Sequence, residues 1–409
     1  MTSDNNHFCI LPWIHMHIWP DGTTFPCCLA TQDYVIGNSN KEELIDIWNS
    51  PKMRLMRTNM LQDKPTSGCQ KCYTQEAAGG ESHRNAMNRD FKHHYDKVEL
   101  TAADGSVETM SMIYMDIRFS NLCNMKCRTC FAGLSSQWHD DAVALGHKDA
   151  DSPRILRFKE SFIEGWSEIK NTMDEVEVIY FAGGEPLIMD EHYKILQYLI
   201  DNNKTDVKLF YNTNFSKLSF KKQSVIELWK HFPNVHLGAS LDGMGMPGEL
   251  IRAGTKWSDI ESNRQTVAKD APHVQFQLSC TVSVYNALHC FDFFDDWIAK
   301  GYVTPDKIDL NLLVDPVHSR VQILPIDIKN EIVQRIDAYL EKYNLKEVDV
   351  HGRAYSSMQA YRSYIMNEDL THLIPEFLDT VQKLDTLRNE QIADYLPIIN
   401  KLYASSHNK

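Results

Sequence analysis

The sequence of 409 residues contains no apolar run long enough to cross a membrane and no excess of positive charge. A membrane-spanning helix needs about 18 or more consecutive apolar residues, so we expect no membrane partner. Lys and Arg number 42 against 55 Asp and Glu, which gives a formal net charge of −13. Proteins that coat nucleic acids depend on clustered Lys and Arg, so we also expect no nucleic-acid partner.

The N-terminal stretch MTSDNNHFCILPWIHMH lacks the basic region and apolar segment that mark a secreted protein. We therefore expect a cytoplasmic location. Internal repeats and low-complexity tracts are absent as well. The uneven distribution of cysteine along the chain remains to be explained.

Eight of the ten cysteines lie within the first 130 residues. In a long chain expected in the cytoplasm, disulfides explain such clustering poorly and metal ligation explains it well. The remaining two, Cys280 and Cys290, occur in apolar patterns and are expected to be buried core residues. The eight early cysteines are therefore the candidate ligands.

The patterns divide the chain into four stretches. Residues 1–80 hold cysteines and turn signals, and the polar residues 81–110 predict a linker. Residues 111–320 alternate strand patterns with helical patterns, which is typical of an α/β domain with a parallel sheet. Residues 321–409 show helical periodicity alone and predict a helical C-terminal extension.

Three predicted strands, at 113–120, 274–282 and 307–314, alternate apolar with polar residues. A parallel strand buried between two helix layers would be almost continuously apolar. The alternation instead indicates that one face packs on helices and the other lines a polar interior, as in an α/β barrel. An antiparallel sheet with one solvated face gives the same pattern and stays open as the alternative.

The most specific motif is NLCNMKCRTC, which holds Cys123, Cys127 and Cys130 at Cys-x3-Cys-x2-Cys spacing. It follows the first strand of the α/β region, and α/β barrels carry their active sites at this end of the strands. Three thiolates leave a tetrahedral zinc ion one ligand short, with His139 the only nearby histidine. They can hold three irons of a [4Fe–4S] cluster and leave the fourth iron open.

This spacing on such a loop resembles the radical S-adenosylmethionine (SAM) superfamily. The resemblance implies a partial (β/α)6 barrel in which the open iron of a [4Fe–4S] cluster binds SAM. Reductive cleavage would give a 5′-deoxyadenosyl radical that abstracts hydrogen from a substrate, with an electron donor such as flavodoxin or ferredoxin. One position departs from the family, because Thr129 stands where an aromatic residue usually contacts adenine, and Phe131 is the candidate substitute.

The next strand pattern, VEVIYFA, runs into Gly183, Gly184 and Glu185. These residues match the family's Gly-Gly-Glu motif, whose backbone carbonyl groups receive the amino group of SAM. Adjacent glycines suit this task, because no Cβ keeps the ligand away from the backbone.

Three later residues near strand ends also fit the family. The resemblance makes Asn214 and Ser240 candidates for contacts to the ribose or the methionine part of SAM. It makes Arg252 a candidate partner of the SAM carboxylate, which a guanidinium can bind with two parallel hydrogen bonds.

The cysteines of residues 1–80 form a second set that resembles the Twitch and SPASM auxiliary-cluster modules of radical SAM enzymes. In relatives this module commonly follows the barrel, whereas here it precedes it. The resemblance implies an auxiliary [4Fe–4S] cluster held by Cys9, Cys27, Cys69 and Cys72, with Cys28 as the alternative to Cys27. A structural zinc ion with four cysteine ligands would use the same ligand type and stays open.

Together these patterns predict a radical SAM enzyme that acts on a peptide or protein. The alternative within the family is a dehydrogenase for a small molecule such as a sugar, a nucleoside or a cyclitol. The alternative from another class is a zinc-stabilised binding protein without enzymatic activity. No residue stands out in the sequence as a general acid, a general base or a radical quencher.

Overall fold

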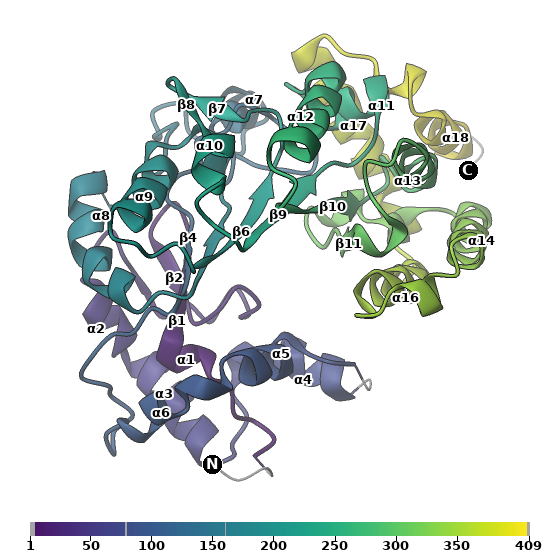
Figure 1. Cartoon of the computed structure of the whole chain (residues 1–409). Helices are drawn as coiled ribbons and strands as arrows, with labels where there is room; N and C mark the ends of the chain where they lie inside the picture. Colours follow the sequence, from purple (N-terminus) through teal and green to yellow (C-terminus); the bar gives the residue numbers. More distant parts are fainter. Residues whose placement is uncertain (1–4, 78–79, 160, 407–409) are drawn as a thin grey trace. The chain divides into compact units, whose positions relative to one another are not determined.

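The structure is a computed structural model, and it describes residues 5–77, 80–159 and 161–406 (Figure 1). The chain forms two compact units, each assembled from three separate stretches. The first unit comprises Met1–Asn121, Ile155–Gly184 and Asp190–Phe210, and the second comprises Leu122–Arg154, Glu185–Met189 and Tyr211–Lys409. The boundaries of the four predicted stretches stay a prediction.

The sheet of the first unit begins with an N-terminal hairpin. Strands β1 (His15–Ile18) and β2 (Thr23–Phe25) pair antiparallel, and β3 (Gly37–Asn38) pairs with β2. On its other edge β1 pairs in parallel with β4 (Tyr114–Ile117), which in turn pairs in parallel with β5 (Val178–Phe181). The hairpin is therefore continuous with the parallel sheet through β1.

Short helices accompany these strands. Helix α1 (Leu11–Ile14) packs against α3 (Pro51–Leu61) and against α5 (His83–Asp90). The segment predicted as a linker thus contains α5, followed by the 3₁₀ helix η2 (Lys92–His94) and by α6 (Asp96–Glu99). The other helices of this unit are α2 (Leu44–Trp48), α4 (Gln70–Ala77), α8 (Phe162–Ile169) and α9 (Asp190–Asp201), with 3₁₀ helices at Ser67–Cys69 and Lys170–Asp174.

Helix α3 shows why these residues form a helix here. Ser50 caps its N-terminus by accepting a hydrogen bond from the backbone N–H of Met53, and Pro51 occupies the first turn, where no N–H partner is needed. Met53, Met56 and Met60 recur at three- and four-residue spacing and are buried. One face of the helix therefore packs into the core of the unit.

The second unit contains a parallel sheet of its own. Strand β10 (Gln275–Val282) pairs in parallel with β9 (Val235–Ser240) on one side and with β11 (Ile308–Leu312) on the other. This pairing excludes the antiparallel alternative for 274–282 and 307–314. Strand β6 (Lys208–Thr213) carries the chain from the first unit into the second, and β7 (Ser219–Phe220) and β8 (Gln223–Ser224) form a separate hairpin.

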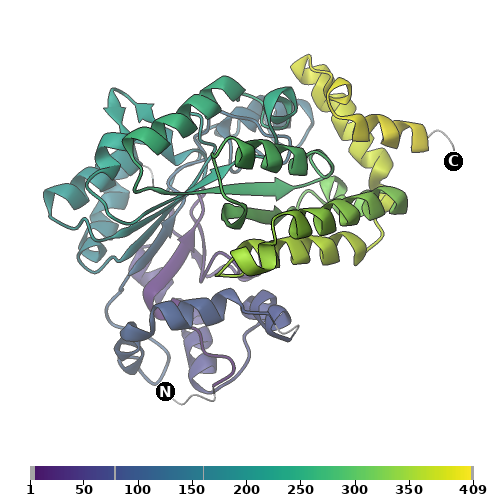
Figure 2. The ribbon, with the colours of Figure 1, turned by 45° about the vertical axis from the view of Figure 1, so that its right-hand side comes forward.

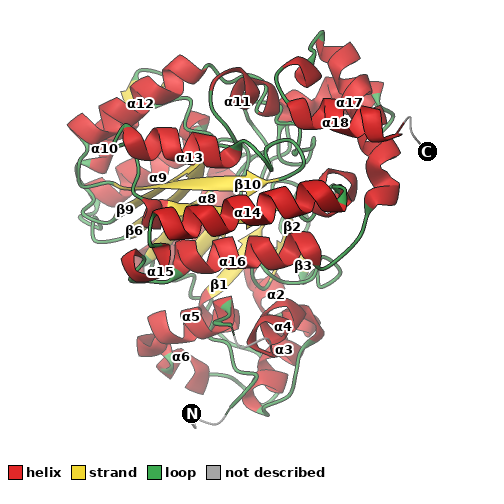
Figure 3. Cartoon of the chain, turned by 90° about the vertical axis from the view of Figure 1, so that its right-hand side faces the viewer, coloured by secondary structure: helices red, strands yellow, loops and turns green. Residues whose placement is uncertain are grey.

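Helices follow the strands of the second unit and fill its C-terminal part. Helices α14 (Ile326–Lys342) and α16 (Arg353–Met366) lie side by side, and α16 packs on β11 (Figure 3). The last two long helices, α17 (Ile374–Arg388) and α18 (Pro397–Ser406), pack against each other (yellow in Figure 2). The others are α7 (His139–Ala144), α10 (Val225–Trp229), α11 (Gly245–Ile251), α12 (Trp257–Asp270), α13 (Cys290–Ala299) and α15 (Leu345–Val348), with short 3₁₀ helices at Ser136–Trp138, Pro186–Ile188, Pro305–Lys307, Val317–Ser319, Val321–Ile323, Thr371–Leu373 and Ile392–Asp394.

The predicted fold class is confirmed. Along the chain the strands β4, β5, β6, β9, β10 and β11 alternate with helices, which is the element order of a (β/α)6 partial barrel, and a helical region follows. Cys280 on β10 and Cys290 on α13 are fully buried core residues, as expected. In the part of the chain that the structure describes, every helix is too short or too polar to cross a membrane.

Candidate functional site

Cys123, Cys127 and Cys130 lie in the loop that follows β4 in the chain. The loop is held from its C-terminal side by hydrogen bonds. The indole Nε1 of Trp138 donates to the carbonyl of Cys127 at 2.7 Å, and the N–H of Cys123 donates to the Oγ of Ser136 at 3.2 Å. Because both contacts involve the backbone of cysteines, they fix where the sulfurs can point.

The segment after α11 holds the same loop from another direction. The N–H groups of Lys126 and Arg128 donate to the carbonyls of Ala253 and Ile251, both at 2.8 Å. Gly254 adopts a φ of +106°, and a Cβ at this position would lie 2.8 Å from the carbonyl oxygen of Asn124. Only glycine allows this approach, so the cysteine loop and the segment 251–254 depend on each other.

The three thiols interact with one another. Burial, together with the neighbouring Cys127, raises the pKa of Cys123 to about 12. Burial also raises the pKa of Cys130, and both other cysteines add to this effect. Buried thiols that oppose each other's ionisation stay protonated unless a metal compensates the charge. A cluster of irons supplies that compensation, so the loop fits one.

The spacing of the sulfurs bears on the zinc alternative. A tetrahedral zinc ion with bonds of about 2.3 Å to sulfur brings its sulfur ligands to about 3.8 Å from one another. Among the described residues no three cysteine sulfurs lie within 4.8 Å of one another. Neither cysteine set therefore has the sulfur spacing of a tetrahedral zinc site in this structure, and metal analysis of the protein decides between zinc and iron–sulfur.

Glu185 ties the loop after β5 to the end of β6. Its carboxylate accepts hydrogen bonds from the N–H of Leu187 at 3.0 Å, the hydroxyl of Thr213 at 2.7 Å and the N–H of Asn214 at 2.7 Å. Burial raises the pKa of Glu185 to about 7, although these hydrogen bonds oppose the rise. The side chain of Glu185 thus positions Asn214, a role that the Gly-Gly-Glu motif does not reveal.

Asn214 reaches the first cysteine. Its Nδ2 lies 3.9 Å from the Sγ of Cys123 and donates to the Oδ1 of Asn124 at 2.9 Å. Its Oδ1 accepts from the hydroxyl of Ser216 at 2.7 Å, and Asn124 donates to the same hydroxyl at 2.9 Å. The sequence analysis missed Asn124 and Ser216, although an amide directly after the first cysteine was a visible signal.

Arg252 lies beside the second cysteine. Its Nη1 is 3.8 Å from the Sγ of Cys127, and its Nε pairs with the Oδ2 of Asp242 at 2.8 Å. Asp242 is almost completely buried, and its other oxygen accepts a hydrogen bond from the N–H of Thr281 at 2.9 Å. The guanidinium is therefore held in one orientation next to the cysteine loop.

The remaining predicted SAM contacts lie at strand ends. Ser240 is the last residue of β9, opposite Ser279 of β10. Gly183 and Gly184 follow β5 in the first unit. Gly183 has a φ of +116°, and the N–H of Gly184 donates to the carbonyl of Ser120 at 3.1 Å. Gly183 thus has a backbone conformation that favours glycine, and Gly184 pairs with the backbone of Ser120. The contact of both glycines with SAM stays a prediction.

We expect the variant Asp242→Asn to lower the free energy of unfolding by about 3–5 kcal/mol, because it leaves the buried charge of Arg252 uncompensated. Denaturant unfolding of the cluster-loaded protein measures this loss. The matched control is Asp337→Asn, since the Asp337–Arg362 pair at 3.0 Å is about half exposed. The control should change stability by about 0.5 kcal/mol or less. Equal losses of unfolding free energy in the two variants would contradict the inference that Asp242 compensates the buried charge of Arg252.

The second cysteine set assembles in the first unit. Burial raises the pKa of Cys9, and Cys69, Cys27 and Cys72 raise it further. Burial likewise raises the pKa of Cys27 to about 12, with Cys69 and Cys72 adding to it. Thiols influence one another in this way only when they are neighbours. Cys9, Cys27, Cys69 and Cys72, the predicted ligand set, therefore lie close together.

Cys28 has different neighbours. Its sulfur interacts with Asp116 and Arg118 as well as with Cys27. Asp116 is fully buried and pairs with His17 and with Arg118, each at 2.8 Å. Cys28 therefore has Asp116 and Arg118 as neighbours, whereas Cys27 interacts with Cys69 and Cys72, and the assignment of Cys27 as the ligand stays a prediction.

Helix α5 holds the backbone on both sides of Cys9. Arg84 and Asn88 both donate to the carbonyl of Phe8 at 2.8 Å, and the Oδ1 of Asn88 accepts from the N–H of Ile10 at 2.8 Å. These contacts come from the segment predicted as a linker. No sequence pattern indicated these contacts, because they join residues about 80 positions apart.

Comparison with known proteins gives one family match. Residues 9–73 match the model of the SPASM family, an iron–sulfur cluster-binding domain. This range contains all five cysteines of the N-terminal set. No curated protein matches the chain.

Solved structures similar to this chain include native anSMEcpe with bound AdoMet and the Cp18Cys peptide, at 17% identity and a TM-score of 0.39, covering 55% of this chain. The chain spans 59% of the length of that protein. Another is SuiB of Streptococcus suis bound to S-adenosylmethionine, at 12% identity and a TM-score of 0.36, covering 80% of this chain and 69% of SuiB. The match at residues 9–73 confirms the predicted auxiliary-cluster domain in this part of the chain.

Proposed function

We propose that the chain reductively cleaves SAM to a 5′-deoxyadenosyl radical and uses the radical to abstract hydrogen from a peptide or protein. The observation that carries this proposal is the cysteine loop with two oriented polar side chains at its sulfurs, Asn214 at Cys123 and Arg252 at Cys127. A [4Fe–4S] cluster on the loop would supply one electron and an iron that no side chain ligates.

The residues around the loop would bind and orient SAM. Arg252 offers its Nη groups to the SAM carboxylate, because Asp242 already occupies its Nε. Glu185 fixes Asn214, which would contact the ribose or the methionine part. Ser240 would share that task, and the backbone at Gly183 and Gly184 would receive the amino group.

The proposal that the substrate is a peptide or protein rests on the SPASM domain, since auxiliary modules of this type frequently serve such substrates. This step is an analogy between families. We propose the cytoplasm as the location, where reduced thiols persist, and flavodoxin or ferredoxin as the electron donor.

Dehydrogenation of a small molecule is the second candidate, and the auxiliary cysteine set favours it. Four cysteines gather there, enough to saturate a cluster, and a saturated cluster is suited to accept the electron of a substrate radical. The two candidates differ in the source of hydrogen. Deuterium from a labelled peptide or from a labelled sugar, nucleoside or cyclitol should appear in 5′-deoxyadenosine, and the substrate that delivers it decides between them.

The decisive assay incubates the anaerobically reconstituted protein with SAM and dithionite. We expect a brown protein with about eight irons per chain, because two four-iron clusters are proposed. We also expect 5′-deoxyadenosine together with methionine. A colourless, zinc-loaded protein that leaves SAM intact would overturn the proposal and favour the zinc-stabilised binding protein.

A further inference from the structure

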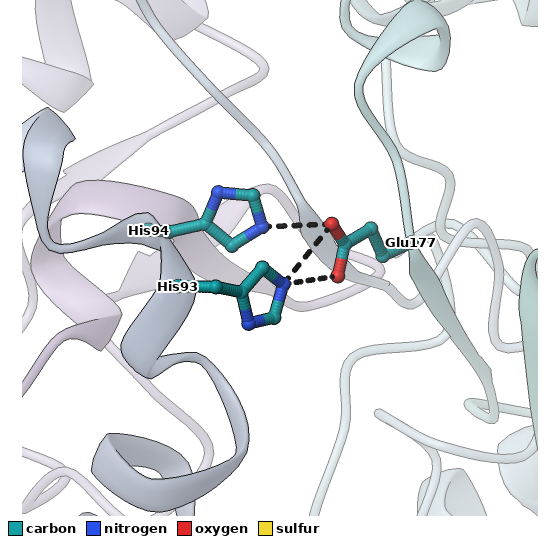
Figure 4. A group of neighbouring side chains, drawn as sticks. All are labelled: His93, His94 and Glu177. Carbon is teal, nitrogen blue, oxygen red and sulfur yellow. Dashed lines mark hydrogen bonds and ion pairs between the residues drawn. The ribbon is translucent and has the colours of Figure 1, made fainter.

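A cluster of two histidines and one glutamate, none of them assigned to the cysteine set, lies in the first unit (Figure 4). His93 and His94 come from the 3₁₀ helix η2, and Glu177 directly precedes β5. The Nε2 of His94 lies 2.8 Å from the Oε1 of Glu177, and the Nε2 of His93 lies 3.0 Å from its Oε2. The sequence analysis had no reason to join these residues, because they are 83 and 84 positions apart.

The two imidazoles converge on the carboxylate. Successive side chains of a 3₁₀ helix point about 120° apart, since the helix has three residues per turn. Here the two ring centroids are only 4.2 Å apart, and both Nε2 atoms face Glu177. Phe91 lies beneath them, with its ring centroid 6.4 Å from each imidazole. The side chain of Phe91 therefore packs against both imidazoles.

The local charge favours a cation. Glu175 lies two residues from Glu177 and pairs with Lys97 at 3.0 Å. Lys97 is thus paired with Glu175, and the carboxylate of Glu177 has the two histidines as its partners.

We propose that His93, His94 and Glu177 bind a divalent transition-metal ion, with zinc as the best match. Two imidazole nitrogens and a carboxylate oxygen are ligands that zinc accepts at about 2.0–2.2 Å, with water in the fourth position. The three ligand atoms lie within 4.8 Å of one another, which is close enough for one ion. His94 is mostly buried, whereas His93 and Glu177 are about half exposed, so the ion can enter from solvent.

This ion would fasten η2 to the start of β5. Helix α5 directly precedes η2, and its Arg84 and Asn88 hold the backbone on both sides of Cys9. The ion would therefore also steady the auxiliary cysteine set through α5. It would lie at the end of β5 opposite Gly183, about 20 Å along the chain, and so take no part in the proposed SAM contacts.

The test uses the cluster-loaded protein, so that the cysteines are already occupied. Anaerobic equilibrium dialysis against zinc chloride at pH 7.5, followed by metal analysis, should find one zinc per chain in the wild type. The variants Glu177→Gln and His94→Ala should each bind it at least about 10-fold more weakly, since each removes a direct ligand.

His318→Ala provides the matched control. His318 also contacts a glutamate, Glu376, at 3.1 Å, but this contact includes one histidine instead of two. Removal of the His318 imidazole should therefore leave zinc binding unchanged. Zinc should also raise the melting temperature of the wild type but not that of Glu177→Gln, whose unchanged iron content would show intact folding. Equal zinc binding by wild type and Glu177→Gln, or no zinc bound by the wild type, would overturn the proposal. Neither result depends on SAM cleavage.

Discussion

Replacing Cys127 with alanine is expected to reduce the formation of 5′-deoxyadenosine to background in the anaerobic assay with dithionite. Cys127 is the central cysteine of the loop, and both its carbonyl and its sulfur have partners, Trp138 and Arg252. Two remaining thiolates hold a four-iron cluster poorly, because each iron at the protein face needs its own sulfur ligand. The effect on activity should therefore be complete, while the first unit keeps its fold.

Cys290→Ala is the control for this experiment. Cys290 is a fully buried cysteine on α13 and lies outside both ligand sets. The control should cleave SAM as the wild type does, with a modest loss of stability from the missing sulfur. Undiminished SAM cleavage by Cys127→Ala would remove the loop from its proposed role.

The second large effect concerns the auxiliary set. We expect Cys69→Ala to lower the iron content from about eight to about four per chain, because one of two four-iron clusters is lost. Burial, together with the neighbouring Cys72, raises the pKa of Cys69 to about 11, as expected for a thiol within a ligand cluster. Iron and sulfide analysis of the reconstituted variant measures the change.

The adjacent cysteines Cys27 and Cys28, which follow β2, allow the sharpest comparison. Cys27→Ala should lose iron as Cys69→Ala does, because Cys27 interacts with Cys9, Cys69 and Cys72. Cys28→Ala should keep about eight irons, since its sulfur lies toward Asp116 and Arg118. The reverse outcome would exchange the roles of these two cysteines. Full iron content in both variants would show that neither is a ligand.

Some parts of the site were predictable from the sequence, and others were not. The loop motif at 123–130 is local in sequence, so its spacing alone indicated three ligands and an open iron. The strands at 274–282 and 307–314 were also recognised, but the alternation of their residues left two sheet arrangements open. Only the pairing of β9, β10 and β11 excluded the antiparallel one.

Residues that act through distant partners escaped the sequence analysis. Glu185 was noted for its backbone, whereas in the structure its carboxylate anchors Thr213 and Asn214 at the end of another strand. The segment 81–110 is polar and suggested a linker, yet α5 within it holds the backbone beside Cys9. Polar composition predicts exposure on average, and it does not reveal which polar groups find a partner after folding.

The sequence by itself determined the ligand types, their local spacing and the order of strands and helices, because these depend on neighbouring residues and on hydrophobic periodicity. Tertiary structure alone showed that Cys27 interacts with Cys69 and Cys72 while Cys28 lies near Asp116 and Arg118, and that Asp242 pairs with Arg252. It also brought His93 and His94 to Glu177. Such contacts join residues far apart in the chain, and their geometry exists only once the strands and helices that carry them have packed.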